Sequence, residues 1–282
     1  MAGKFARSWN LMKASAAVLR SDKALMMFPL LSGLCCLLVA ASFIIPIAVA
    51  AAGMEHVSRD TLPIGWYVAT FAFYLVQYFV IIFFNTALAG AALQRLRGEP
   101  TSLSAGFDIA KSRIGAIFGY ALIAATVGLL LRALQERLGF VGRLVAGLLG
   151  LAWTVATFLV VPVLANEKIG PMEAVQRSVE LLKRTWGENL IGNAGIGVVF
   201  GLLTFVAIVI AGALVVGALT TESMPLIIAA IAVAVIGLTL LALVQASLQG
   251  IYSAALYQYA EEGTVGGGFD QALLEKAFRS KD

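Results

Sequence analysis

Long apolar segments separated by short polar connections dominate this sequence. A helix needs about 20 apolar residues to cross a hydrocarbon core of about 30 Å, and six segments are long enough. They cover residues 25–52, 64–94, 114–131, 144–165, 190–219 and 225–259. None of them contains Asp, Glu, Lys or Arg. The pattern predicts an all-α, polytopic membrane protein with six transmembrane helices.

Three details of these segments need separate interpretation. The fifth and sixth are joined by residues 220–225, enough for a tight hairpin because Pro225 can begin a helix. The third and fourth flank an amphipathic joint at 132–143, so that pair could form a shallower hairpin. The first segment is long enough to span the membrane, and we expect it to remain as an anchor rather than be cleaved as a signal peptide. Pro46 and Pro162 could kink their helices.

The connection at 171–186 has the periodicity of an amphipathic helix lying in the membrane interface. Its apolar stripe is Met172, Val175, Val179, Leu182 and Trp186. Its charged stripe is Glu173, Arg177, Glu180 and Arg184, which predicts two i,i+4 pairs, Glu173 with Arg177 and Glu180 with Arg184.

The same arrangement of a surface helix followed by a hairpin recurs along the chain. Residues 7–13 align with 177–183, and 103–114 give a shorter middle copy. This predicts one integral membrane domain over 1–282 with a threefold internal repeat, although a chance coincidence of amphipathic helices remains an alternative. The repeat units are about 1–94, 101–165 and 171–259, followed by a tail at 260–282 that contains a fourth amphipathic stretch. The prediction is therefore three or four interfacial helices on the cytoplasmic side.

The composition agrees with this class, and the distribution of charge predicts how the chain is oriented in the membrane. Of the 282 residues, 60% are hydrophobic and 13% are charged, which excludes a soluble domain. With the N-terminus inside, sixteen of the 20 Lys and Arg residues fall on the cytoplasmic side, so both termini should be cytoplasmic. The excess of Lys and Arg over Asp and Glu predicts contact with the lipid bilayer and its anionic lipids at that face, not with nucleic acid.

Several short stretches carry a family resemblance. They are residues 5–9 (FARSW), 25–33 (LMMFPLLSG), 269–270 (FD) and 277–279 (AFR). With these the chain resembles an uncharacterised family of bacterial integral membrane proteins, known only as a domain of unknown function. Its plan is more loosely similar to the membrane domain attached to some glycerophosphodiester phosphodiesterases. The resemblance implies a multi-pass protein of the bacterial inner membrane and supplies no catalytic residues.

The chemistry-bearing residues argue against an enzyme. His56 is the only histidine, so neither an HExxH metalloprotease nor a lipid phosphatase that needs histidine with arginine clusters is expected. Cys35 and Cys36 are neighbours in an apolar run and imply neither a disulfide nor a metal site. We expect the pair Glu261 and Glu262 to form a solvated helix end. No catalytic, cofactor-binding or metal-binding residue is predicted, and no cofactor.

Neutral polar residues inside the spans are the remaining candidates for a functional site. They are Gln77, Asn85, Asn193, Gln245 and Gln249. Interhelical hydrogen bonding is the favoured interpretation, and a polar lining for a solute path is the alternative. The GxxxG pairs Gly115 with Gly119 and Gly197 with Gly201 favour packing within one subunit, and a homo-oligomer stays open.

These observations favour a noncatalytic inner-membrane protein that organises membrane or protein partners. The alternative is a transporter or channel for small solutes, since neutral polar residues could line its path. An enzyme acting on lipid substrates is a third class with less support. Protein partners and a transported solute are not indicated by the sequence.

Overall fold

The computed structural model describes residues 13–52, 64–137, 139–186, 195–263 and 266, and its regular elements there are all helical. Residues 13–21 are helical and lead into a 3-10 turn, η1, at Lys23–Met26. The helices that follow are α2 (Met27–Ala52), α3 (Ile64–Leu96), α4 (Leu103–Ser112), α5 (Ile114–Arg137), α6 (Gly139–Ala156), α7 (Val160–Asn166), α8 (Pro171–Trp186), α9 (Gly195–Leu219) and α10 (Met224–Glu262).

Six segments are long and apolar enough to cross a membrane, which confirms the predicted number of spans. They are Lys23–Pro46, Gly65–Leu96, Ile114–Glu136, Gly142–Asn166, Gly201–Leu219 and Met224–Glu262. The third and fourth are longer than predicted because α5 continues to Arg137 and α6 begins at Gly139, so the amphipathic joint is itself mostly helix.

The fourth span is interrupted near a proline. The chain forms turns at 157–159 between α6 and α7, and Pro162 lies inside α7. Proline cannot donate to the carbonyl four residues earlier, here that of Phe158, and its ring crowds that carbonyl. The missing hydrogen bond and the crowding at Pro162 therefore explain the position of the break. Pro46, by contrast, lies within a continuous α2.

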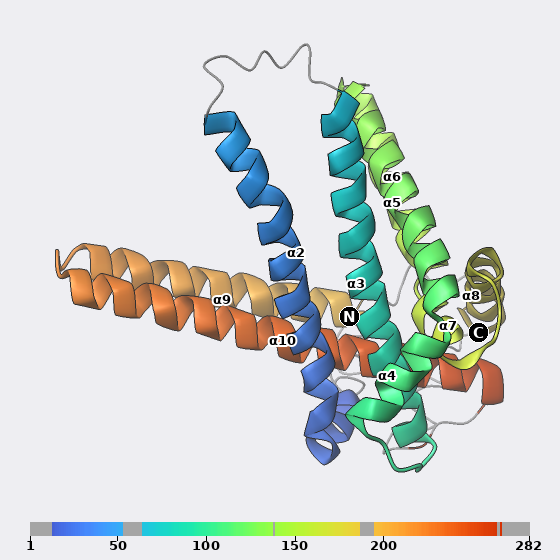
Figure 1. The fold of residues 1–282 in the computed structure, drawn as a ribbon. Helices are drawn as coiled ribbons and strands as arrows, with labels where there is room; N and C mark the ends of the chain where they lie inside the picture. Colours follow the sequence, from blue (N-terminus) through green and yellow to red (C-terminus); the bar gives the residue numbers. More distant parts are fainter. Residues whose placement is uncertain (1–12, 53–63, 138, 187–194, 264–265, 267–282) are drawn as a thin grey trace.

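Most of the buried core lies at one end of the bundle, where α4, α7, α8 and the last turns of α3 and α10 meet (Figure 1). We call this end the base. Small residues let the backbones approach closely there. A Cβ built on Gly106 of α4 would lie 2.5 Å from Phe28 Cζ and 2.8 Å from the Ala87 carbonyl oxygen, and one on Gly250 of α10 would collide with Leu88. Close packing of the helices at the base thus depends on glycine and alanine residues.

The short helices pack against this core. Their buried residues are Ala14, Ser15, Val18 and Leu19 in the first, Gly106 and Ala110 in α4, and Ala174, Ser178, Leu181 and Leu182 in α8. Each short helix precedes two long segments, so the element order is helix then hairpin three times. Internal duplication of the sequence, and location of these helices in a membrane interface, stay predictions.

The buried face of α8 coincides only in part with the predicted apolar stripe, of which Leu182 is buried and Val175 packs against the core. Met172 is 55% exposed, whereas Ala174 and Ser178 are completely buried. Small residues contribute little to a hydrophobic pattern, yet they let α8 approach α7 and α10, with which it is in contact. Gly119 of α5 likewise makes room for Pro171 at the start of α8, with an added Cβ 2.8 Å from Pro171 Cγ.

The hairpin of α9 and α10 is arranged differently from the other long helices. It projects sideways from the bundle and runs across the direction of α2, α3 and α5 (Figure 1). Large apolar side chains of α9 and of the first half of α10 are exposed, among them Phe205, Ile210, Ile228 and Val235. Only the second half of α10 enters the base, where Ile251 and Leu256 are fully buried. The hairpin is therefore anchored at one end and otherwise presents apolar surface.

Candidate functional site

The polar residue Gln77 of α3 bridges two helices. Its Nε2 donates to the carbonyl oxygen of Cys36 in α2 at 3.1 Å, while its Oε1 is buried without a partner. The pair joins residues of the first two spans, and the side chain is half-buried between them. Gln77 thus joins α3 to α2 by a hydrogen bond.

A second bridge joins the hairpin helices. Thr204 Oγ1 of α9 donates to Gln245 Oε1 of α10 at 3.1 Å. Gln249, one turn further on, is exposed, and Asn85 of α3 is half-buried without a side-chain hydrogen bond to the described residues. Asn193 lies outside the described residues. Of the four described residues, Gln77 and Gln245 therefore each bond a neighbouring helix.

A cluster of charged residues at the base is the most connected polar feature of the described chain. We call Arg97, Glu167, Arg177, Glu261 and Glu262 the base charge cluster. Arg97, just after α3, bonds Glu262 Oε1 of α10 at 2.7 Å. Arg177 of α8 bonds Glu261 Oε2 at 2.5 Å and Glu167 Oε1 at 3.3 Å. The cluster therefore joins the ends of α3 and α10, the middle of α8 and the loop between α7 and α8.

Two neutral side chains make the cluster continuous. Asn166 accepts from Arg97 Nη1 at 3.1 Å and donates through Nδ2 to the Tyr257 hydroxyl at 2.9 Å. That hydroxyl donates to Glu167 Oε1 at 3.0 Å. Because the carboxylate and guanidinium groups are partly shielded from water here, such partners replace hydration that they lose. Burial opposes the charge of Arg177, but its bond to Glu167 and the charges of Glu261 and Glu167 hold its pKa above the ordinary value, so it stays charged.

Two sequence predictions are corrected by this cluster. Glu261 and Glu262 are not simply a solvated helix end, because their carboxylates bind Arg177 and Arg97. Arg177 pairs with Glu180 at i,i+3 and with more distant carboxylates, whereas Glu173 accepts from the Gly170 amide at 2.9 Å as a helix N-terminal cap. Arg97 and Glu262 both stand at predicted cytoplasmic helix ends. That shared location was the signal in the sequence that could have indicated their pairing.

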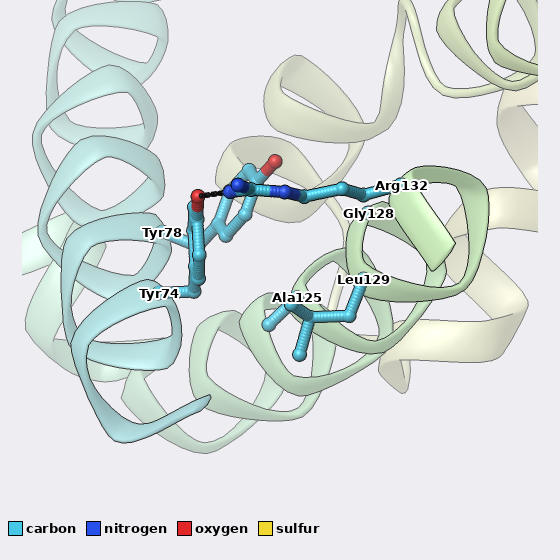
Figure 2. Close-up of a pocket in the computed structure, with 6 residues that line it drawn as sticks. All are labelled: Tyr74, Tyr78, Ala125, Gly128, Leu129 and Arg132. Carbon is cyan, nitrogen blue, oxygen red and sulfur yellow. Dashed lines mark hydrogen bonds between the residues drawn. The ribbon is translucent and has the colours of Figure 1, made fainter. Parts of the chain in front are cut away.

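A small notch opens between α3 and α5 at the end away from the base (Figure 2). Its volume is about 70 Å³, and its lining is Tyr74, Tyr78, Ala125, Gly128, Leu129 and Arg132. Arg132 Nη1 donates to the Tyr74 hydroxyl at 2.7 Å, and Arg132 Nε bonds Glu136 at 2.9 Å. The sequence indicates an amphipathic joint at 132–143 but not its pairing with Tyr74 and Tyr78, since α3 and α5 are brought together only by the fold.

Candidate metal ligands are sparse in the described residues. They contain no group of three or more His, Cys, Asp or Glu side chains placed to hold a metal ion. Cys35 and Cys36 are free thiols, half-buried in α2.

Comparison with known proteins places the chain in a family. No curated protein matches it, so the looser resemblance to the membrane domain of glycerophosphodiester phosphodiesterases gains no support. A family of unknown function, DUF6159, matches residues 64–268. The match runs from α3 to just beyond α10, so the terminal stretches that carried the resemblance lie outside it. Because it covers well over half of the sequence, the chain belongs to the DUF6159 family of unknown function.

Proposed function

We propose that this chain is a noncatalytic bacterial inner-membrane protein that organises lipid or protein partners at its base. The proposal rests on the hydrogen bonds that the polar side chains within the spans make to neighbouring helices. Gln77 binds a carbonyl of α2, and Gln245 accepts a hydrogen bond from α9. A solute path needs polar groups that face a common space, whereas these groups bind neighbouring helices.

The base supplies the surface for such partners. Basic residues after α3, in α4 and in α8 gather at this end of the bundle, and Lys111, Lys183 and Arg184 are exposed there. We infer that the base faces the cytoplasm with both termini, because basic residues accumulate on that side of bacterial membranes. An exposed basic face attracts anionic lipids at about 1 kcal/mol for each Lys or Arg near the surface.

Orientation is tested by labelling single cysteines in a variant without Cys35 and Cys36. A membrane-impermeant maleimide added outside intact cells should modify Glu136→Cys, at the end of α5 away from the base, and leave Glu173→Cys unmodified. Both positions should react after the membrane is permeabilised. Labelling of position 173 in intact cells contradicts a cytoplasmic base.

The absence of a solute path is tested in proteoliposomes that contain the full chain. Wild-type vesicles should release trapped small solutes no faster than protein-free vesicles. A specific flux that disappears in the double variant Gln245→Leu and Gln249→Leu, with assembly intact, would establish the transporter alternative. The matched control is Gln77→Leu, which alters a bridge between two other helices.

Partner organisation is tested by photo-crosslinking in cells. A photoreactive residue in place of Met172, which is 55% exposed on α8, should form a discrete adduct with phospholipid or with one protein. The same residue at Leu240, exposed on the hairpin, serves as the control for contact with bulk lipid. Identical adducts at both positions contradict a partner surface at the base.

A further inference from the structure

The notch between α3 and α5 lies at the height of a membrane interface. Arg132 stands eighteen residues after Ile114, which begins α5 at the base. At 1.5 Å per residue this is about 27 Å along the helix. Since the hydrocarbon core is about 30 Å thick, a base at one interface places Arg132 near the other, where lipid phosphate groups lie.

Hydrogen-bond donors converge on this notch. The Tyr74 oxygen accepts from Arg132 at 2.7 Å, so its own proton is left to donate. Tyr78 lies beside the guanidinium (Figure 2), and its hydroxyl has no hydrogen-bond partner among the described residues. The guanidinium carries five N–H donors, of which the bonds to Tyr74 and Glu136 occupy two. The hydroxyls of Tyr74 and Tyr78 and the guanidinium of Arg132 therefore line the same notch.

The space suits a small anion. The notch holds about 70 Å³, several times the roughly 10–15 Å³ that one water needs. Gly128 keeps it open, because a Cβ at that position would lie 3.2 Å from the Tyr78 hydroxyl. Ala125 and Leu129 give the remaining lining an apolar character, which suits the glycerol and acyl portion of a lipid.

The carboxylate already bound to Arg132 is a weak competitor. The side chains of Arg132 and Glu136 are 59% and 65% exposed, and an ion pair that is so open to solvent is weak. A phosphate group offers a full negative charge and oxygens that match the guanidinium fork. We propose that Arg132, Tyr74 and Tyr78 form a binding site for a phosphate group, carried by a phospholipid headgroup or by free phosphate. This site is independent of the proposed function, because it lies at the opposite end of α3 and α5 from the base.

The test uses the full chain in a neutral detergent and follows the thermal midpoint during titration. The probes are dihexanoyl phosphatidylglycerol, dihexanoylglycerol with the same chains but no phosphate, and inorganic phosphate. The phospholipid should raise the midpoint and dihexanoylglycerol should not. Removing one charge-assisted partner should weaken the fitted Kd about tenfold in Arg132→Gln and about three- to tenfold in Tyr74→Phe.

Two further variants sharpen the result. Glu136→Gln removes the competing carboxylate and should tighten the phospholipid Kd, and Gly128→Ala should weaken it without changing any charge. The control Arg184→Gln loses the same charge at the base and should leave the Kd within about twofold. Phospholipid bound to the base would survive Arg132→Gln, so the proposed function can fail or hold separately.

Each outcome decides the proposal. A midpoint shift by inorganic phosphate with the same dependence on Arg132 and Tyr74 supports the site and identifies free phosphate as sufficient. A shift by phospholipid alone supports the site and identifies the headgroup as its source. Equal shifts with dihexanoylglycerol, or a Kd unchanged in Arg132→Gln, Tyr74→Phe and Gly128→Ala, overturn it, leaving an arginine and two tyrosines that merely border the membrane.

Discussion

The two halves of α10 belong to one continuous helix but have different surroundings. In the first half, Ile228 is 64% exposed and a Cβ on Gly237 would meet nothing within 4 Å. In the second half, Ile251 is fully buried and a Cβ on Gly250 would collide with Leu88. Both halves are apolar, so hydropathy alone does not distinguish a segment that faces lipid from one that packs in the base.

The physical reason is that lipid tails are as apolar as leucine. Between helices already inside a membrane there is little hydrophobic driving force, and close packing and hydrogen bonds decide which surfaces meet. The second half of α10 offers both, with small residues such as Ala254 and Ala255 and a hydroxyl on Tyr257 that bonds Asn166 and Glu167. Stability should therefore be concentrated in the base.

The largest effect is expected from matched leucine truncations in the base and the hairpin. Leu181 of α8 is fully buried, whereas Leu240 of α10 is 53% exposed. Leu181→Ala leaves a cavity and should lower the free energy of unfolding by about 2–5 kcal/mol. Leu240→Ala should change it by under about 0.5 kcal/mol, because Leu240 contacts lipid in both the packed and the separated helices.

Unfolding of both variants in the same lipid-detergent mixture, with wild type beside them, provides the measurement. Met172→Ala adds a control on α8 itself, since Met172 belongs to the predicted apolar stripe but is exposed. A loss in Met172→Ala that equals the loss in Leu181→Ala would show that the predicted stripe, not the observed buried face, holds α8.

The next effect comes from adding volume at two glycines of α10. Gly250→Val should lower the free energy of unfolding by about 1–3 kcal/mol, since the fully buried Leu88 must move to admit it. Gly237→Val meets open space and should be nearly neutral. Thermal midpoints of the two variants in one detergent give the comparison. Equal losses would mean that the first half of α10 also packs tightly, for example against another subunit.

A smaller loss is expected in the base charge cluster. Arg177→Gln leaves Glu167 and Glu261 close together without their cation and should cost about 1–2 kcal/mol, toward the lower end for hydrogen bonds to charged groups because the side chain is 22% exposed. Arg184→Gln, an exposed position on the same helix, should be neutral. Added salt should reduce the difference between the two variants, since it screens partly exposed pairs. A loss in Arg184→Gln as large as that in Arg177→Gln would contradict the cluster.

These comparisons also explain what the sequence could predict. The number of spans depends on local length and apolarity, which is why all six segments were recognised. An amide is costly to leave unpaired in an apolar span, which gives a physical reason for the bonds of Gln77 and Gln245 to neighbouring helices. The interruption near Pro162 likewise follows from one residue's own chemistry.

The features that sequence did not predict depend on the tertiary arrangement. The buried face of α8 includes Ala174 and Ser178, which carry little hydrophobic signal but pack closely. The base charge cluster joins Arg97 to Glu262, 165 positions apart, and the notch joins Tyr74 to Arg132. Pairings between separate helices leave no periodic pattern in a single sequence, so they can be identified only in the folded structure.

The smallest effect concerns the hydrogen bond inside the hairpin. Thr204→Val removes the hydroxyl that donates to Gln245 and should cost about 0.6 kcal/mol, the average for such contacts in membrane proteins. Thr204→Ser retains the donor and should be nearly neutral. A double-mutant cycle of Thr204→Val with Gln245→Leu isolates the bond, because its coupling energy excludes what each side chain contributes separately. A coupling of zero would mean that the amide of Gln245 finds another partner, and the hairpin would then be held by apolar packing alone. A coupling near the expected value would show that even the lipid-exposed part of α10 carries one specific contact, which narrows the difference between its two halves.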